Sequence, residues 1–217
     1  MYLNYLFIFT TINSNINMNK ENIENIENIE NRENKENKEN KDNKENPSIT
    51  IDLENTLKLI LFNEKHLEEY YQLIEKNRIY LKNQVAFIDF VFSLEDVKKF
   101  FIPRFLKPEN DLTFSINKDG KIIGAIGIHN INKIEKNCTM GYWLDNDCRR
   151  KGIMTQAIKA LIKYCFNYLN LEEIQVDVKD DNISSQNLAI KNGFIKERIR
   201  FDKDLKWNLF EFSLKKH

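Results

Sequence analysis

The pattern of apolar and polar residues divides the chain into two parts. Residues 10–50 have no apolar face with a period of 3.6 or 2, because Asn recurs at every third position through most of this segment. A short isoleucine spacing within it ends after three residues, and Asn is a poor helix former. Nothing in this part would offset the entropy cost of ordering the chain. We therefore predict a disordered, low-complexity tail over residues 1–50 and one folded domain over residues 51–217.

The second part alternates between strand-like and helix-like spacing of apolar residues. Short apolar runs predict strands over residues 57–62, 112–117, 121–129, 137–144, 174–178, 194–201 and 207–214. Helical spacing predicts helices over residues 64–77, from Ser93 to a bend or end at Pro103, over residues 154–169, and from Asn182 to an Asn192-Gly193 cap. Asp119-Gly120 predicts a tight hairpin. The order predicts an α/β fold, with a mixed, mostly antiparallel sheet of six to seven strands and helices on both faces.

A basic loop, Arg149-Arg150-Lys151-Gly152, joins the strand at 137–144 to the next helix. Backbone N–H groups converge at a helix N-terminus, and the helix dipole places partial positive charge there. Three cations at this position are unfavourable unless an anion is bound beside them. We interpret the loop as a phosphate-binding site; the competing interpretation is a solvated basic turn.

Charge and composition narrow the possible functions. The chain has 33 basic and 33 acidic residues, and residues 20–46 hold nine acids against six bases, so the folded part is only mildly basic. That excess is too weak to indicate nucleic acid, but it suits a small anionic ligand.

The three cysteines and three histidines lack metal-site spacing, and free thiols fit a reducing compartment. The apolar stretch at residues 1–9 is too short for a membrane span and lacks the features of a signal peptide. We predict a cytoplasmic protein without a metal; a weak organelle presequence is the alternative.

The motifs resemble those of the GNAT acetyltransferase superfamily. Its acetyl-CoA motif, Gln/Arg-x-x-Gly-x-Gly/Ala, is similar to Arg149, Gly152 and Met154, although Met154 replaces the usual small residue. A second segment, with Asn182, Ser185 and a terminal Gly193-Phe194, resembles the helix that runs along the pantetheine arm. Four shorter segments resemble the RimJ/RimL-type branch, which acetylates ribosomal proteins: Asn77-Arg78-Ile79-Tyr80-Leu81, Gly127-Ile128-His129, Gly141-Tyr142-Trp143-Leu144 and Gly152-Ile153-Met154-Thr155.

The resemblance implies a central pair of splayed strands and acetyl-CoA as the co-substrate. The N–H groups from Arg150 to Thr155, which include those of Gly152, Ile153 and Met154, would then hold the pyrophosphate. Side chains of Arg149, Arg150 and Lys151 would add positive charge. A backbone N–H near Trp143 or Leu144 would contact the acetyl oxygen, and Asn182 would lie beside the donor. We expect Ser185 to protonate the leaving thiolate, unless it merely caps or packs its helix.

The acceptor and the general base are less defined. A site without an obvious strong base suits an α-amine, whose pKa lies near about 8, better than a lysine at about 10.4. We therefore expect direct attack by a protein N-terminus in a ternary complex, in a monomer or homodimer that binds neither nucleic acid nor membrane. Alternatives are a small amine, polyamine or antibiotic as acceptor, or a non-catalytic acyl-CoA-binding module. Asp204, Glu197 and His129 are candidate bases; Asp89, Asn77 and Arg78 are weaker candidates for the acceptor side.

Overall fold

The computed structural model describes residues 49–82, 84–105 and 108–216. The tail predicted over residues 1–50 lies almost entirely outside this range, so that interpretation stays a prediction. The elements are, in chain order, β1 (Thr50–Asp52), β2 (Leu57–Leu61), η1 (Glu64–His66), α3 (Leu67–Leu81), η2 (Ala86–Phe90), α4 (Leu94–Phe105), β3 (Leu112–Lys118), β4 (Lys121–Asn132), β5 (Asn137–Leu144), η3 (Asn146–Cys148), α5 (Ile153–Asn167), β6 (Glu173–Lys179), α6 (Ile183–Lys191), β7 (Ile195–Asp202) and β8 (Trp207–Lys215).

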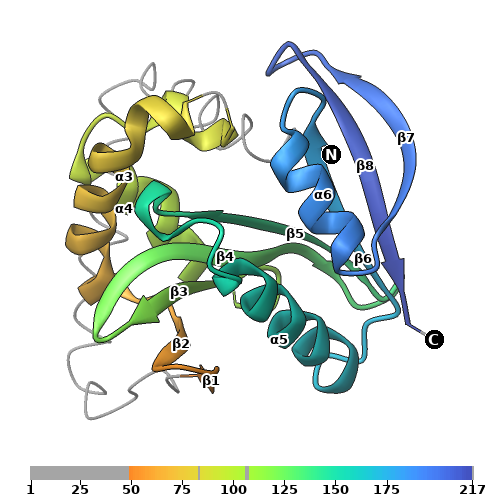
Figure 1. Ribbon diagram of the computed structural model, residues 1–217, viewed down its shortest axis with the longest axis horizontal. Helices are drawn as coiled ribbons and strands as arrows, with labels where there is room; N and C mark the ends of the chain where they lie inside the picture. Colours follow the sequence, from red (N-terminus) through yellow and green to blue (C-terminus); the bar gives the residue numbers. More distant parts are fainter. Residues whose placement is uncertain (1–48, 83, 106–107, 217) are drawn as a thin grey trace, which may run out of the picture. The chain divides into compact units, whose positions relative to one another are not determined.

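The strands form one mixed sheet in the order β1-β2-β3-β4-β5-β6-β8-β7 (Figure 1). Neighbouring strands are antiparallel except β5 and β6, which are parallel. The fold class is confirmed, but the expected count of six to seven strands is wrong, because the sheet has eight. The additional strand, β1, has three residues and begins at Thr50. Three residues are too few to show a period of two, so the sequence pattern could not reveal it.

The turn and cap residues predicted from the sequence adopt the expected backbone conformations. Asp119 and Gly120 both have positive φ, 50° and 80°, as a tight hairpin between β3 and β4 requires. Asn63 caps η1 by accepting a hydrogen bond from the backbone N–H of Lys65, and Gly193 follows α6 with φ 91°. Helix α4 continues for two residues past Pro103 and ends at Phe105. Pro103 removes one backbone N–H donor from the helix, which ends within two residues of it.

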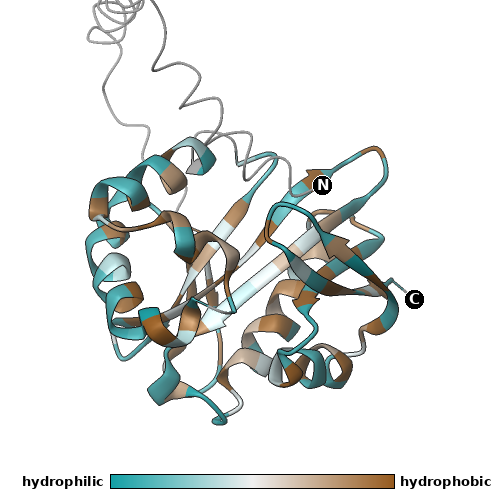
Figure 2. Ribbon diagram, turned by 90° about the horizontal axis from the view of Figure 1, so that it is seen from above, coloured by the Kyte–Doolittle hydropathy of each residue, from teal (hydrophilic) through white to brown (hydrophobic). Residues whose placement is uncertain are grey.

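Helices cover both faces of the sheet, as Figures 1 and 2 show. One face packs Met140 and Leu144 of β5 into a continuous apolar core with Ile158 and Leu161 of α5. Side chains alternate along a strand, so Trp143 lies on the opposite face. There its Nε1 donates a hydrogen bond of 2.8 Å to the hydroxyl of Tyr70 on α3. Helix α3 therefore covers one face of β5, and α5 covers the other.

The two parallel strands at the centre of the sheet separate along their length. Strands β5 and β6 pair only at Asn137–Glu173, Cys138–Ile174 and Thr139–Gln175. Beyond that point β6 stays paired with β8 as far as Lys179, while β5 stays paired with β4 as far as Leu144. The sheet is therefore open between the second half of β5 and the second half of β6, and the splayed strand pair is confirmed.

Candidate active site

The basic loop leads into α5 through two residues in the left-handed conformation. Arg150 has φ 60°, and Gly152, which is the N-cap of α5, has φ 75°. A Cβ built on Gly152 would meet no atom within 4 Å, so the space beside this residue is open. The first N–H groups of an α-helix have no partner within the helix. At the start of α5 they are therefore available to an anion, and the dipole of this 15-residue helix adds to the attraction.

Two residues of α3 fix the start of this loop. Lys76 Nζ lies 2.8 Å from Asp145 Oδ2 and 2.6 Å from Asp147 Oδ2. The buried Asn77 accepts a hydrogen bond of 3.0 Å from the backbone N–H of Asn146. Burial alone would raise the pKa of Asp145, but the hydrogen bonds from Lys76, from the Asp147 N–H and from Asn77 hold that pKa below its ordinary value. Helix α3 thus anchors the segment that carries the loop.

The Lys76–Asp145 pair predicts a pH-dependent loss of stability. Because the pKa of Asp145 is lowered in the folded state, its contribution is complete above the unfolded value of about 3.9 and is lost as the pH falls through the lower, folded value. We expect Lys76→Met to lower the free energy of unfolding by about 1 kcal/mol at pH 7, since Lys76 is half exposed and solvent screens the pair. Urea unfolding should show the difference from wild type shrinking toward pH 3.

The matched control for this prediction is Lys58→Met. Lys58 pairs with Asp52, and both side chains are at least half exposed. We expect its removal to change the unfolding free energy very little at either pH. An equal loss at pH 7 and pH 3 in the Lys76 variant would show that Asp145 is not held ionised by Lys76.

A cavity of about 420 Å³ occupies the opening between β5 and β6. It brings together residues from β5, the basic loop, α5, β6, α6 and the end of α3. Ten of the predicted site residues line it: Trp143, Leu144, Arg149, Arg150, Gly152, Ile153, Met154, Thr155, Asn182 and Ser185. Residues that are distant in sequence therefore meet at one cleft, as the interpretation of the motifs required.

The three cations of the loop have different surroundings. Arg149 lies with its guanidinium carbon 4.8 Å from the centre of the Tyr80 ring, and its Nη2 donates to Ser184 Oγ at 3.3 Å. Arg150 is exposed at the cavity. Lys151 does not line the cavity, because its Nζ turns back and donates to the carbonyl oxygen of Asp147 at 2.8 Å. Two of the three cations thus face the cleft.

Met154 does not obstruct the loop, although it departs from the small residue of the motif. Its side chain is 8% exposed and belongs to the same apolar core as Ile158 and Leu161, at the point where the residue lines the cavity. The backbone N–H of this residue remains at the start of α5, where the donors converge. The substitution therefore alters the packing under the loop and leaves its donor groups in place.

The backbone of β5 presents every second N–H group to the opening. The N–H of Asp145 donates to the carbonyl oxygen of Ile123 on β4, so the odd-numbered backbone groups at this end of β5 face β4. A Cβ on Gly124 would lie 2.5 Å from the carbonyl oxygen of Trp143, which places that group on the same side. The N–H of Leu144 therefore faces the opening. Of the two residues expected to contact an acetyl oxygen, Leu144 has the appropriate backbone direction.

Helix α6 begins at the same cleft. The side chain of Asn182 caps it, since Oδ1 accepts hydrogen bonds of 3.1 Å from the Ser185 N–H and from Ser184 Oγ. Over the described part of the chain, the Oγ of Ser185 has no hydrogen-bond partner. Asn182 thus orders the first turn of the helix, and the Ser185 hydroxyl is free to contact a ligand in the cavity.

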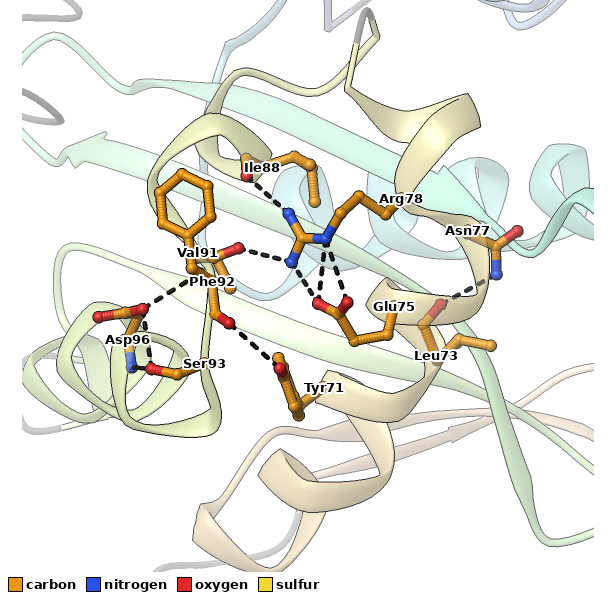
Figure 3. Close-up of polar contacts among 10 residues, drawn as sticks. All are labelled: Tyr71, Leu73, Glu75, Asn77, Arg78, Ile88, Val91, Phe92, Ser93 and Asp96. Atoms are coloured by element: carbon orange, nitrogen blue, oxygen red, sulfur yellow. Dashed lines mark hydrogen bonds and ion pairs between the residues drawn. The ribbon is translucent and has the colours of Figure 1, made fainter.

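The far side of the cleft is closed by the segment after α3. Tyr80, Gln84 and Val85 line the cavity there. Figure 3 shows Arg78 holding the following segment, with Nη1 donating to the carbonyl oxygen of Ile88 at 3.2 Å and Nη2 to that of Val91 at 2.6 Å. Arg78 and Asn77 do not line the cavity; they hold the neighbouring backbone segments in place and do not form its surface. Asp89 also lies outside the lining.

None of the three candidate bases from the sequence lines the cavity. Nδ1 of His129 lies 3.2 Å from Asp111 Oδ1, and Glu197 accepts a hydrogen bond of 2.6 Å from Ser213 Oγ. Asp204 lies in the turn between β7 and β8. Among the described residues that line the cavity, the one carboxylate is Asp177 on β6, which was not singled out from the sequence.

A metal site and a membrane-spanning helix each place requirements on the described residues. No group of three or more His, Cys, Asp and Glu residues in the described ranges is placed to hold a metal ion. No helix that the structure describes is long and apolar enough to cross a membrane.

Comparison with known proteins identifies the class that this fold and cleft define. Residues 56–195 match the family model described as the acetyltransferase (GNAT) domain. The chain belongs to the GNAT family of acetyltransferases. Among curated relatives it is 33% identical, over 150 residues, to the ribosomal-protein-serine acetyltransferase of Escherichia coli K12. That match covers 68% of this chain and 84% of the relative.

Solved structures give the same fold. RimL, a ribosomal L7/L12 α-N-protein acetyltransferase in complex with coenzyme A, superimposes with a TM-score of 0.73 at 22% identity, covering 77% of this chain and 98% of that one. The microcin C7 self-immunity acetyltransferase MccE, in complex with acetyl-CoA and AMP, gives a TM-score of 0.71 at 26% identity, covering 78% and 97%. The RimJ/RimL-type resemblance of the sequence motifs is confirmed.

Proposed function

We propose that this protein transfers the acetyl group of acetyl-CoA to the α-amine of a protein N-terminus, of the ribosomal-protein type. The observation that carries the proposal is the position of the anion-binding loop, Arg149–Thr155, at one end of a cleft that passes between β5 and β6. A donor held at this loop and an acceptor entering beside Tyr80 and Gln84 meet inside the sheet.

The residues of the cleft fit acetyl-CoA. The open space at Gly152 and the N–H groups at the start of α5 suit a pyrophosphate, and Arg149 and Arg150 supply positive charge beside it. The N–H of Leu144 is directed where a thioester carbonyl would develop negative charge, and such a donor contributes roughly 3–4 kcal/mol when well placed. Ser185 is the proton donor that we propose for the leaving thiolate.

The acceptor class is supported by relatives. The Escherichia coli relative is named for acetylating a ribosomal-protein serine, and RimL is named for the α-amine of ribosomal L7/L12. An α-amine also loses its proton more readily than a lysine at neutral pH, which favours the α-amine as the attacking group. The three free thiols, at Cys138, Cys148 and Cys165, fit the cytoplasmic location that we propose with this activity.

Rates of coenzyme A release test the proposal across acceptors. Purified protein and acetyl-CoA are mixed with Ser- and Met-initiated peptides, Nα-blocked lysine peptides, spermidine and aminoglycosides, and free thiol is followed with DTNB. We expect the unblocked peptides to exceed every other acceptor in kcat/KM by at least tenfold. Preferential turnover of a small amine would replace the protein N-terminus as acceptor, and donor binding without turnover on any amine would support a non-catalytic module.

A further inference from the structure

Asp177 lies in the open half of β6, two residues beyond the last pair with β5. Its neighbours Val176 and Val178 are buried in the core. Because side chains alternate along a strand, Asp177 is on the opposite face, the face on which α3 covers β5. It also lines the cavity, together with Tyr80 and Gln84. Asp177 is therefore a cavity-lining residue on the face of the sheet that α3 covers.

Three carboxylates share one guanidinium at this position. Arg200 on β7 contacts Asp177 Oδ2 at 2.8 Å, Asp202 Oδ2 at 3.0 Å and Glu211 Oε1 at 2.7 Å. Glu211 is also paired with the exposed Arg198. These three carboxylates outnumber the two guanidinium groups, those of Arg200 and Arg198, by one. Four cations of the described residues also line the cavity, Arg149, Arg150, Lys179 and Lys191, and Lys179 is paired with Asp181.

We propose that Asp177 is a catalytic residue of the acetyl transfer, which binds the ammonium form of the acceptor and takes its proton. The inference rests on the proposed function. Asp177 is the only carboxylate among the described residues that line the cavity. A primary ammonium would add the positive charge that the group around Arg200 lacks. Asp202 and Glu211 cannot substitute, because neither lines the cavity.

The ionisation of Asp177 suits this role. Its side chain is 14% exposed, and this burial raises its pKa above the ordinary value, with Glu211 and Asp202 acting in the same direction and Arg200 opposing them. The charged groups that face it are Arg200 and Asp202 on β7 and Glu211 on β8. Lys179, further along β6, is held by Asp181 at 2.8 Å. A carboxylate with a raised pKa is a stronger base toward an amine.

The proton balance of the reaction is complete with these groups. The ammonium gives one proton to the Asp177 carboxylate and becomes a neutral amine. The amine nitrogen forms a bond to the thioester carbon, and the carbon–sulfur bond breaks. The second amine proton reaches the sulfur by way of Ser185, which gives its own proton and is reprotonated. Asp177 then releases its proton to water, and the net products are the amide, coenzyme A and one proton.

Asp177→Asn tests the assignment through its pH dependence. Without the base, only acceptor that is already neutral reacts, so we expect kcat/KM for a Ser-initiated peptide to fall about 100-fold at pH 6.5. The deficit should narrow to less than tenfold by pH 9, above the pKa of an α-amine. Acetyl-CoA affinity should stay within threefold of wild type. Asp177→Glu keeps a carboxylate and should recover at least a tenth of the wild-type rate.

Two outcomes would overturn the inference while leaving the proposed function intact. One is a wild-type rate in Asp177→Asn; the other is a loss of equal size at every pH, which a purely structural partner of Arg200 would give. Glu173→Gln is the control, because Glu173 lies on the same face of β6 in the paired half, outside the cavity. It should retain the wild-type pH profile. Absence of turnover in wild type on any peptide would instead reject the proposed function.

Discussion

Gly152→Asp is expected to raise the dissociation constant for acetyl-CoA by more than 100-fold. The side chain would enter the open space beside Gly152, where nothing lies within 4 Å of the added Cβ, and would place a carboxylate where the pyrophosphate is proposed to bind. At an effective dielectric constant of about 20, two unit charges about 4 Å apart repel by about 4 kcal/mol. Isothermal titration calorimetry with acetyl-CoA measures the change directly.

Gly120→Asp is the matched control for this prediction. Gly120 also has positive φ, 80°, and a Cβ there would likewise meet no atom within 4 Å. It lies in the hairpin between β3 and β4, outside the cavity. The two variants therefore carry the same cost of a left-handed non-glycine residue, and only one adds charge to the cleft. Equal acetyl-CoA affinities in both variants would remove the loop from the donor site.

Ser185→Ala is expected to lower kcat by about 100- to 1,000-fold while acetyl-CoA affinity changes little. The hydroxyl lines the cavity and is the group that we propose to protonate the departing thiolate, a kind of assistance that typically contributes 10²–10⁴-fold. The first turn of α6 should survive the change, because Asn182 binds the backbone N–H of Ser185 rather than its side chain. Single-turnover acetylation of a peptide isolates this chemical step.

Two further variants define the cause of that loss. Ser185→Thr keeps a hydroxyl and should retain more activity than Ser185→Ala. Ser184→Ala removes the adjacent hydroxyl, which already donates to Asn182 Oδ1, and we expect at most a few-fold change. A wild-type kcat in Ser185→Ala would exclude this hydroxyl from the mechanism.

The basic loop at the cleft could be located from the sequence because its signals are local. Cations, one glycine and a helix start lie within a few residues of one another, and their chemistry does not depend on distant strands. Lys151 is the exception. The left-handed backbone at Arg150 redirects the chain, and Lys151 bonds to the carbonyl of Asp147 instead of lining the cavity. Composition could not reveal that change of direction.

The β6 side of the cleft depends on tertiary structure, and the sequence does not single it out. Alternation along β6 indicates that Asp177 and Val176 occupy opposite faces, but it does not indicate that β5 leaves β6 at this point. Nor does the sequence show that β8 lies between β6 and β7, which is the arrangement that brings Arg200 to Asp177. Tyr80 and Gln84 line the cleft beside a segment that Arg78 holds through the carbonyl oxygens of Ile88 and Val91, and neither contact can be read from the sequence.

The most direct test of the proposed function is the position of the acetyl group on a peptide that offers two amines. A short peptide with an N-terminal serine and an internal lysine is incubated with the protein and acetyl-CoA, and fragment-ion mass spectrometry assigns the modified nitrogen. The cleft and its proposed chemistry predict one acetyl group, on the α-amine, and loss of that product with Gly152→Asp. Acetylation on the lysine side chain, or an unmodified peptide under conditions in which acetyl-CoA binds, would contradict the proposal.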